Sequence, residues 1–84
     1  MYNILYKKSV EKDLRKLPKP ILLIIVSKIQ KLSENPKPNG SVKLRGATNL
    51  YRIRHADYRI IYSIDGKELT IIVIKVAHRK EVYR

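Results

Sequence analysis

The feature that most constrains the fold is a regular alternation of side chains in the second half of the chain. Residues 51–55 read YRIRH and residues 58–64 read YRIIYSI, so polar or charged side chains alternate with apolar ones. A period of two is typical of β-strands whose two faces meet different surroundings. Residues 69–76 are apolar at both parities, as in a central strand that is covered on both faces. The pattern therefore predicts three strands.

Two short turns are expected to join these strands. Asp65-Gly66 lies between two β-rich runs and is the strongest short hairpin signal in the chain, so we expect a two-residue loop there. Ala56-Asp57 is expected to form the preceding turn, which sets Arg54 opposite Arg59. A three-residue turn would shift this second register.

Strand parity then assigns the two faces of the sheet. The expected core face carries Tyr51, Ile53, Tyr58, Ile60, Tyr62, Leu69, Ile71 and Val73. The opposite face carries Arg52, Arg54 and Arg59, with Ile61, Ile72 and Ile74 beside them. Like charges on facing strands destabilise a sheet by a few tenths to ~1 kcal/mol, so stability alone does not favour this arrangement. An anion between the guanidinium groups would offset the repulsion; the alternative is an ordinary solvated face.

The first half of the chain predicts a strand and two helices. Residues 2–6 alternate weakly, as in a short strand. Ser9 can cap a helix that ends before Pro18. A second helix is expected from about Pro20 to Glu34. Its apolar run ILLIIV also fits a buried strand, but the later periodicity and the length favour a helix.

These elements predict a single α+β domain over residues 1–84. An N-terminal strand and a helical hairpin should pack on one face of a small antiparallel sheet. The chain has no Cys and two His, which excludes disulfides and thiol chemistry and disfavours a metal centre, so no cofactor or metal is expected. No apolar run approaches a membrane span and no signal peptide is visible, so we expect a cytoplasmic protein without a membrane partner.

The charge of the chain indicates an anionic partner. Lys and Arg number 19 against 7 Asp and Glu, a net charge of +12, and both halves of the chain contribute equally. Such a surface suits nucleic acid, a ribosome or an acidic protein. Six of the ten basic residues after position 40 are Arg, which suits forked contacts to phosphate better than Lys does.

Several further residues are candidate contacts to nucleic acid. Lys43 and Arg45 flank Leu44 before a glycine, and they offer phosphate contacts or form a solvated edge strand. The tail HRKEVYR supplies His78, Arg79, Lys80 and Tyr83. A tyrosine beside a basic groove can stack an unpaired base, and a histidine can serve as acid or base near neutral pH.

In these segments the sequence resembles the RelE/ParE toxin superfamily of prokaryotic toxin–antitoxin systems. The resemblance rests on the order and spacing of RKL at 15–17, KLRG at 43–46, YRIR at 51–54, YRIIY at 58–62 and HRKEVYR at 78–84. It implies a helical hairpin on one face of an antiparallel sheet, with a concave, basic active face opposite. It also implies an antitoxin as partner, and operator DNA reached only through the antitoxin complex.

The resemblance to the RelE-like branch implies cleavage of mRNA in the ribosomal A site. The residues carried over by motif are Arg52, Arg54, Arg59, Arg79 and Tyr83. Arg59 and Arg79 would hold the phosphate, Arg54 would support them, and Tyr83 would stack a base or hold the 2′-hydroxyl. The branch commonly has Lys at positions 52 and 54. Arg cannot act as a general base, because its pKa lies above 12; the base is then His78, Tyr83 or no protein group.

Two other functions remain open from the sequence. The ParE-like branch shares the fold and inhibits DNA gyrase without doing chemistry, although it generally lacks the full basic and aromatic set. A basic RNA-binding module without catalysis is the third reading. In the toxin readings, the antitoxin is expected to be acidic or amphipathic and to cover Leu23, Ile24 and part of the basic surface.

Overall fold

The computed structural model describes residues 1–46 and 48–78 and contains two helices and one five-stranded sheet. In chain order the elements are β1 (Asn3–Tyr6), α1 (Lys8–Arg15), α2 (Lys19–Lys31), β2 (Val42–Lys43), β3 (Leu50–His55), β4 (Tyr58–Asp65) and β5 (Thr70–His78). The strands lie in the order β1-β5-β4-β3-β2. This is the predicted α+β fold. Within the described ranges, neither helix has the length and apolar character needed to cross a membrane.

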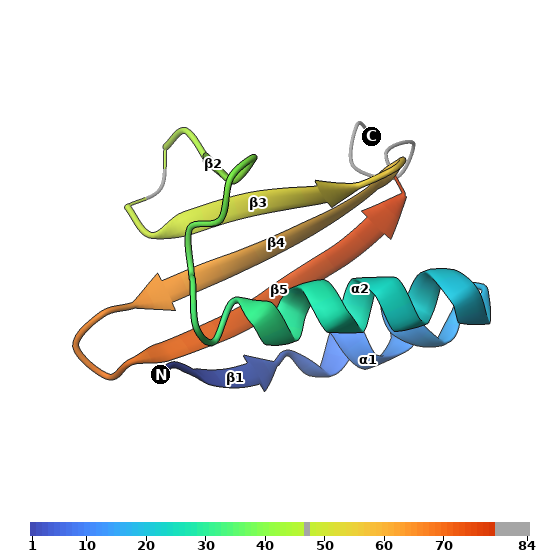
Figure 1. The fold of residues 1–84 in the computed structure, drawn as a ribbon, viewed down its shortest axis with the longest axis horizontal. Helices are drawn as coiled ribbons and strands as arrows, with labels where there is room; N and C mark the ends of the chain where they lie inside the picture. The colour runs from blue at the N-terminus through green and yellow to red at the C-terminus, as the bar shows by residue number, and fades with distance from the viewer. Residues whose placement is uncertain (47, 79–84) are drawn as a thin grey trace.

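The sheet is mixed rather than wholly antiparallel. Strands β2 to β5 are antiparallel neighbours, as predicted, but β1 lies parallel to β5, with Asn3 opposite Thr70 and Tyr6 opposite Val73. A parallel pair needs a long crossover connection, and here the helices and the other strands provide it. The chain therefore begins at the sheet edge beside its last described strand (Figure 1).

Prolines set the start of the second helix. Pro18 precedes the first residue of α2, and Pro20 lies in its first turn, where a missing N–H leaves no hydrogen bond unmade. The predicted cap at Ser9 is wrong: the cap position is Lys7, two residues earlier, so α1 begins at Lys8, and no side chain caps it. The extended backbone of Lys7 supplies the boundary instead, because Val10 N donates to the Lys7 carbonyl oxygen over 2.9 Å.

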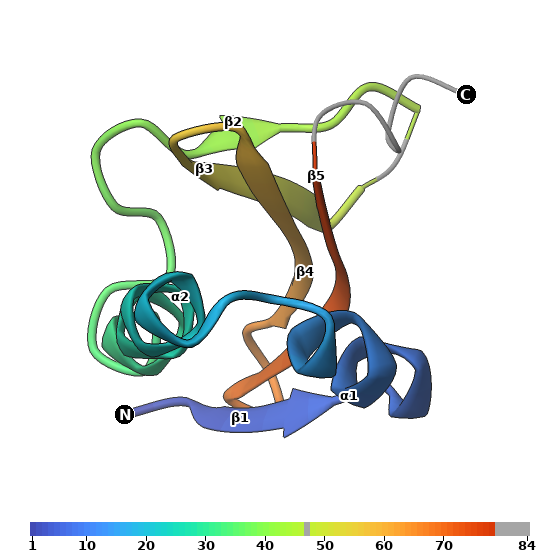
Figure 2. The same ribbon diagram turned by 90° about the vertical axis from the view of Figure 1, so that its right-hand side faces the viewer.

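One apolar cluster joins the helices to the sheet. From the helices it contains Val10, Ile25, Ile29 and Leu32, and from the sheet Ile53, Ile60, Tyr62, Ile71, Val73 and Val76. Burying each aliphatic side chain of this size stabilises the fold by about 1.5–3 kcal/mol. Both helices lie near the β1 end of the sheet and away from β2 (Figure 2). This layering leaves the other face of the sheet free of helices.

The hairpin between β4 and β5 differs from the prediction. Asp65 pairs with Thr70, so residues 66–69 form a four-residue loop instead of a two-residue one. The Asp65 carboxylate explains the longer loop, because its Oδ1 accepts hydrogen bonds from the backbone N–H groups of Lys67 and Glu68 at 3.0 and 3.1 Å. Leu69 is thus a half-exposed loop residue with a φ of 49°, and its assignment to the core was wrong.

A β-bulge in β5 also changes the predicted register. Tyr62 pairs with Val73 but Ile61 pairs with Lys75, so Ile74 is an extra residue without a partner across the strand pair. As a result Val73 and Val76 are both buried although they lie three positions apart. An apolar run gives no signal for such an insertion.

Candidate functional site

Two arginines face each other across the β3–β4 hairpin. The turn at Ala56-Asp57 has two residues, as predicted, and it places Arg54 directly opposite Arg59 and His55 opposite Tyr58. Ala56 adopts a φ of 52°, a conformation that L-residues rarely take. The tight turn fixes the register on which the site depends.

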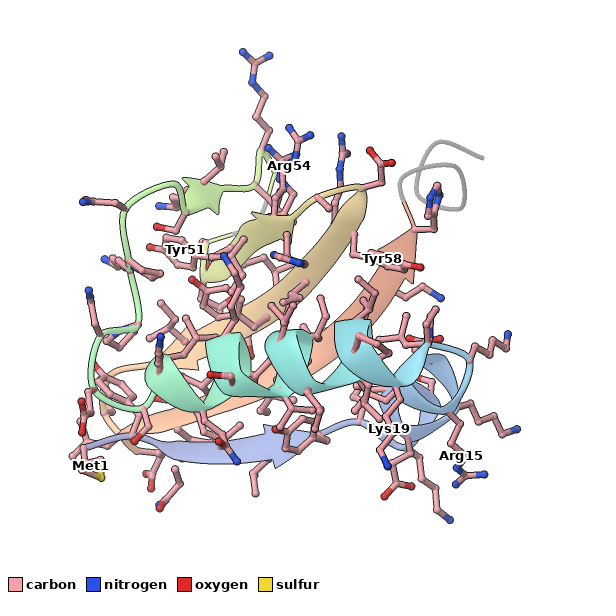
Figure 3. All side chains as sticks on the ribbon, turned by 45° about the vertical axis from the view of Figure 1, so that its right-hand side comes forward. Met1, Arg15, Lys19, Tyr51, Arg54 and Tyr58 are labelled. Atoms are coloured by element: carbon pink, nitrogen blue, oxygen red, sulfur yellow. The ribbon has the colours of Figure 1, made fainter. Side chains whose placement is uncertain are left out.

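The predicted arginine face is present in the backbone arrangement. Ile53 and Ile60 are buried in the core, so their neighbours Arg52, Arg54 and Arg59 belong to the opposite side of the sheet. We call this side the arginine face. Figure 3 shows Arg54 at the end of the molecule away from Arg15 of α1 and Lys19 of α2. The strand period thus puts three arginines on the side of the sheet that the helices leave uncovered (Figure 2).

The three arginines differ in their exposure. Arg54 is exposed, Arg52 is half-buried, and Arg59 is only 8% exposed. Within the described part of the chain, no acceptor lies within hydrogen-bonding distance of the buried Nε of Arg52. A buried N–H group without a hydrogen-bond acceptor costs free energy, because it has lost its hydrogen bonds to water. Arg52 therefore keeps a buried donor that none of the described residues satisfies.

Arg54 is also tied to the helical layer through its backbone. Lys28 on α2 donates from Nζ to the Arg54 carbonyl oxygen over 3.3 Å. Both residues line a groove of about 720 Å³ between the C-terminal half of α2 and β3, with Leu32 and Ile53 also in its lining. The hydrogen bond links the β3 backbone at the arginine face to the helix behind it.

Lys43, another predicted contact residue, lies on the other side of the sheet from the arginine face. Lys43 is opposite Tyr51, and residues that face each other across a strand pair share one side of the sheet, which here is the side of the helices. Arg45 is exposed in the turn after β2. Arg79, Lys80 and Tyr83 lie outside the described residues.

His78 also lies on the helix side. It pairs with Tyr58, and the two rings meet edge to face with centroids 5.3 Å apart. Tyr58 packs against the core, whereas the next pair along the strands, Arg59 and Ala77, is on the arginine face. The register therefore separates the imidazole from the arginines by the thickness of the sheet.

A second tyrosine group secures the loop that follows α2. The Tyr62 hydroxyl donates to the carbonyl oxygen of Pro36 over 2.7 Å, its ring stacks on Tyr51 with centroids 6.1 Å apart, and Lys37 Nζ lies 5.3 Å from the centre of the Tyr51 ring. Burial, and after it the electrostatic interaction with Tyr51, raises the pKa of Tyr62 to about 12. Tyr62 is thus a neutral hydrogen-bond donor that anchors the loop to the sheet.

Two residues at β5, Lys75 and its neighbour Asp13 on α1, were not predicted from the sequence. Lys75 follows the bulge and lies in register with Ile61, itself the partner of Arg52. Asp13 on α1 is 3.8 Å from Lys75 Nζ and also accepts a hydrogen bond from Val76 N. A signal for Asp13 existed, because it falls among the apolar positions Val10, Leu14 and Leu17 of the same helix.

The arrangement can hold an anion but offers no clustered carboxylates. Among residues 1–46 and 48–78, no group of three or more His, Asp and Glu side chains is placed to hold a metal ion. Guanidinium forks in a partly desolvated setting bind phosphate oxygens and stabilise negative charge that develops on them. The site thus supports electrostatic work on a phosphate.

Known proteins are similar to this chain in sequence and in fold. Residues 4–83 match the family model described as ParE toxin of type II toxin-antitoxin system, parDE. The chain is 31% identical to Toxin RelG of Mycobacterium tuberculosis, with 99% of this chain and 97% of the relative covered. It is 38% identical to Toxin RelE3 of Methanocaldococcus jannaschii, with 96% and 94% covered.

Solved structures agree with the sequence relatives. The RelE chain of the archaeal RelE–RelB complex from Pyrococcus horikoshii superposes with a TM-score of 0.83 at 34% identity, covering 93% of this chain and 94% of that one. The isolated RelE toxin of Escherichia coli gives 0.82 at 28% identity, covering 99% and 92%. The family match spans nearly the whole chain, and the chain therefore belongs to the RelE/ParE superfamily of toxins from type II toxin–antitoxin systems.

Proposed function

We propose that this toxin is a ribosome-dependent endonuclease that cleaves mRNA in the ribosomal A site. The observation that carries the proposal is the pair Arg54 and Arg59, two facing cations on the side of the sheet that the helices leave uncovered. Relatives over the full length are named RelE and RelG toxins, which favours the RelE-like branch. A net charge of +12 suits a polyanionic target.

The reaction would be a transfer of phosphate within the RNA chain. The ribose 2′-oxygen attacks the adjacent phosphorus, the bond from phosphorus to the 5′-oxygen breaks, and the products are a 2′,3′-cyclic phosphate and a free 5′-hydroxyl. The 2′-hydroxyl gives up one proton and the leaving oxygen gains one. Arg59 and Arg79 would hold the phosphate and stabilise its charge in the transition state, and Arg54 would support them.

Few residues of this chain could accept the proton of the 2′-hydroxyl. Arg52 and Arg54 cannot accept a proton at any relevant pH. The placement of His78 against Tyr58, on the helix side, argues against a direct role for its imidazole at the arginine face. Tyr83 or solvent is then the acceptor, and the arginines do most of the catalytic work through charge.

A second candidate function rests on the family match itself. The family model that matches this chain is named after the ParE toxin. The ParE-like branch inhibits DNA gyrase without cleaving nucleic acid. The same basic face would then contact gyrase or its DNA. The two functions differ in substrate, so a direct assay separates them.

The partner proposed for this chain is an antitoxin encoded beside it. Several structural neighbours are complexes of RelE with RelB, among them the intact complex from Escherichia coli. On α2, Leu23 and Ile24 remain 63% and 40% exposed, an apolar pair that an amphipathic antitoxin segment would cover. Operator DNA would be bound by the antitoxin in the complex.

One experiment tests the proposed function. Purified toxin is added to a reconstituted translation mixture, the ends of the mRNA are mapped, and a sample without ribosomes serves as the control. Cuts at fixed positions within codons, only in the presence of ribosomes, are the expected result. Intact mRNA together with a loss of gyrase supercoiling would favour the ParE-like function. If neither mRNA nor supercoiling is affected, the remaining hypothesis is an RNA-binding module without catalysis.

A further inference from the structure

Asp13 occupies an unusual position for an acid in this chain. It lies on the inner side of α1, close to the buried Val10, and only 12% of its side chain is exposed. Its Oδ2 accepts a hydrogen bond from the backbone N–H of Val76 over 3.3 Å, and its Oδ1 lies 3.8 Å from Lys75 Nζ. A helix side chain thus contacts two consecutive residues of the central strand.

The contact falls where β1 stops covering the edge of β5. The β1–β5 pairing ends at Tyr6 and Val73, and Lys7 N donates the last such hydrogen bond to the Val73 carbonyl oxygen over 3.0 Å. The chain then turns into α1. Beyond that point the Asp13 carboxylate supplies the acceptor that a continuing strand would have offered to Val76 N.

The two residues that Asp13 contacts follow directly after the bulged Ile74. With the bulge, Arg59 pairs with Ala77 and Tyr58 with His78. If the Tyr62–Val73 register continued without it, Lys75 would lie beside the buried Ile60. A cation in that part of the core would be costly. The bulge therefore keeps Lys75 out of the core and sets a small alanine beside Arg59.

We propose that Asp13 is a positioning residue that holds the bulged register of β5 and thereby places Ala77 beside Arg59 at the arginine face. This inference rests on the proposed function only for its effect on activity, since the register itself can be measured separately. Because β5 ends at His78, directly before Arg79 in the sequence, the same contact fixes the strand residues that precede Arg79. Asp13 does not touch the substrate and acts through β5.

The register is tested first by NMR on the full chain. In Asp13→Ala, we expect the Val76 amide to exchange with solvent about tenfold faster than in the wild type, and the Arg59–Ala77 cross-strand contacts to weaken. Asp13→Asn keeps an acceptor oxygen and should preserve most of the protection. Val10→Ala is the matched control, because it opens a cavity where the same helix packs on the core but leaves the acceptor of Val76 N in place, so Val76 should stay protected relative to its neighbours.

Activity is measured next, at a temperature where all variants are folded. In the ribosome assay, Asp13→Ala should lower the single-turnover cleavage rate about tenfold, leave the affinity for ribosomes unchanged, and be largely rescued in Asp13→Asn. Val10→Ala should cleave like the wild type. A defect in Val10→Ala equal to that in Asp13→Ala would reduce Asp13 to a merely stabilising residue and overturn the proposal.

The outcomes separate the two proposals. If the wild type does not cleave mRNA, the proposed function fails while the NMR register still decides the role of Asp13. An unchanged Val76 amide and unchanged Arg59–Ala77 contacts in Asp13→Ala would overturn the inference whatever the activity. Asp13→Glu, which keeps the charge but displaces the carboxylate, is the second variant if Asp13→Ala does not fold; it should show the same faster exchange at Val76, and native protection there would count against the inference.

Discussion

Arg54 and Arg59 stand directly opposite each other on β3 and β4, so one pair of positions in the sheet holds two cations. Like charges in this geometry repel by a few tenths to about 1 kcal/mol. Arg54→Gln should therefore raise the free energy of unfolding by that amount at low salt, and the gain should shrink at high salt because ions screen the repulsion. Urea unfolding at two salt concentrations measures both effects. Arg15→Gln, on an exposed position of α1, is the control, and a destabilised Arg54→Gln would show that no repulsion is stored there.

Arg59 on β4 and Arg79, which follows β5 in the sequence, are the two arginines proposed to hold the phosphate. Arg59→Ala and Arg79→Ala should each lower mRNA cleavage by about a hundredfold or more, because each removes a donor to the phosphate in the transition state. Growth arrest on expression should be lost in parallel. Arg15→Ala removes an arginine near the helices and should retain both effects. Full cleavage by both Arg59→Ala and Arg79→Ala would remove the site assignment.

The exposed apolar pair on α2 should matter for the antitoxin and little for the fold. Leu23→Asp and Ile24→Asp replace side chains that are 63% and 40% exposed, so the free energy of unfolding should change by about 0.5 kcal/mol or less. Binding of the antitoxin should weaken by about tenfold or more, measured by calorimetry with the purified partner. Leu69→Asp, in the β4–β5 loop, is the comparison variant. Unchanged affinity in both α2 variants would place the antitoxin elsewhere.

Tyr62, which anchors the loop after α2, should make the free energy of unfolding fall at high pH. Burial raises the pKa of Tyr62 to about 12, above the ordinary value of 10.0, so the folded state favours the neutral phenol. The resulting stabilisation is complete below pH 10 and is lost as the pH rises toward 12. Wild type should thus lose about 2 kcal/mol more than Tyr62→Phe across this interval. Parallel pH curves for the two proteins would contradict the expectation.

The turn between β3 and β4 offers a stabilising substitution. Ala56 has a φ of 52°, where an L-residue is strained and glycine is not. Ala56→Gly should raise the free energy of unfolding by up to about 1 kcal/mol, measured by thermal or urea unfolding. Asp57→Gly, at the neighbouring turn position that lacks a positive φ, should not stabilise the protein and serves as the control.

The sequence was a good guide wherever periodicity alone decides the structure. Alternation in residues 51–64 predicted the arginine face, and the short turn at Ala56-Asp57 fixed the Arg54–Arg59 register correctly. The two helices followed from apolar spacing and from the flanking prolines. These features are local, so neighbouring residues carry the information.

The errors have a different physical origin. At Asp65 a side chain competes with the backbone for hydrogen bonds and lengthens the loop, which displaced Leu69 from the core. The bulge at Ile74 is decided by what packs on each side of β5, including Asp13 from a distant helix. The parallel pairing of β1 likewise depends on residues almost at the other end of the chain.

That parallel pairing has a consequence for when the protein takes shape. Strand β1 is synthesised before the other described elements, yet the strand it lies against is synthesised after all of them. Closing so long a stretch is slow relative to local contacts. The sheet of a nascent copy therefore cannot close until β5 has left the ribosome, and β1 waits without its partner while the helices and the other strands are made.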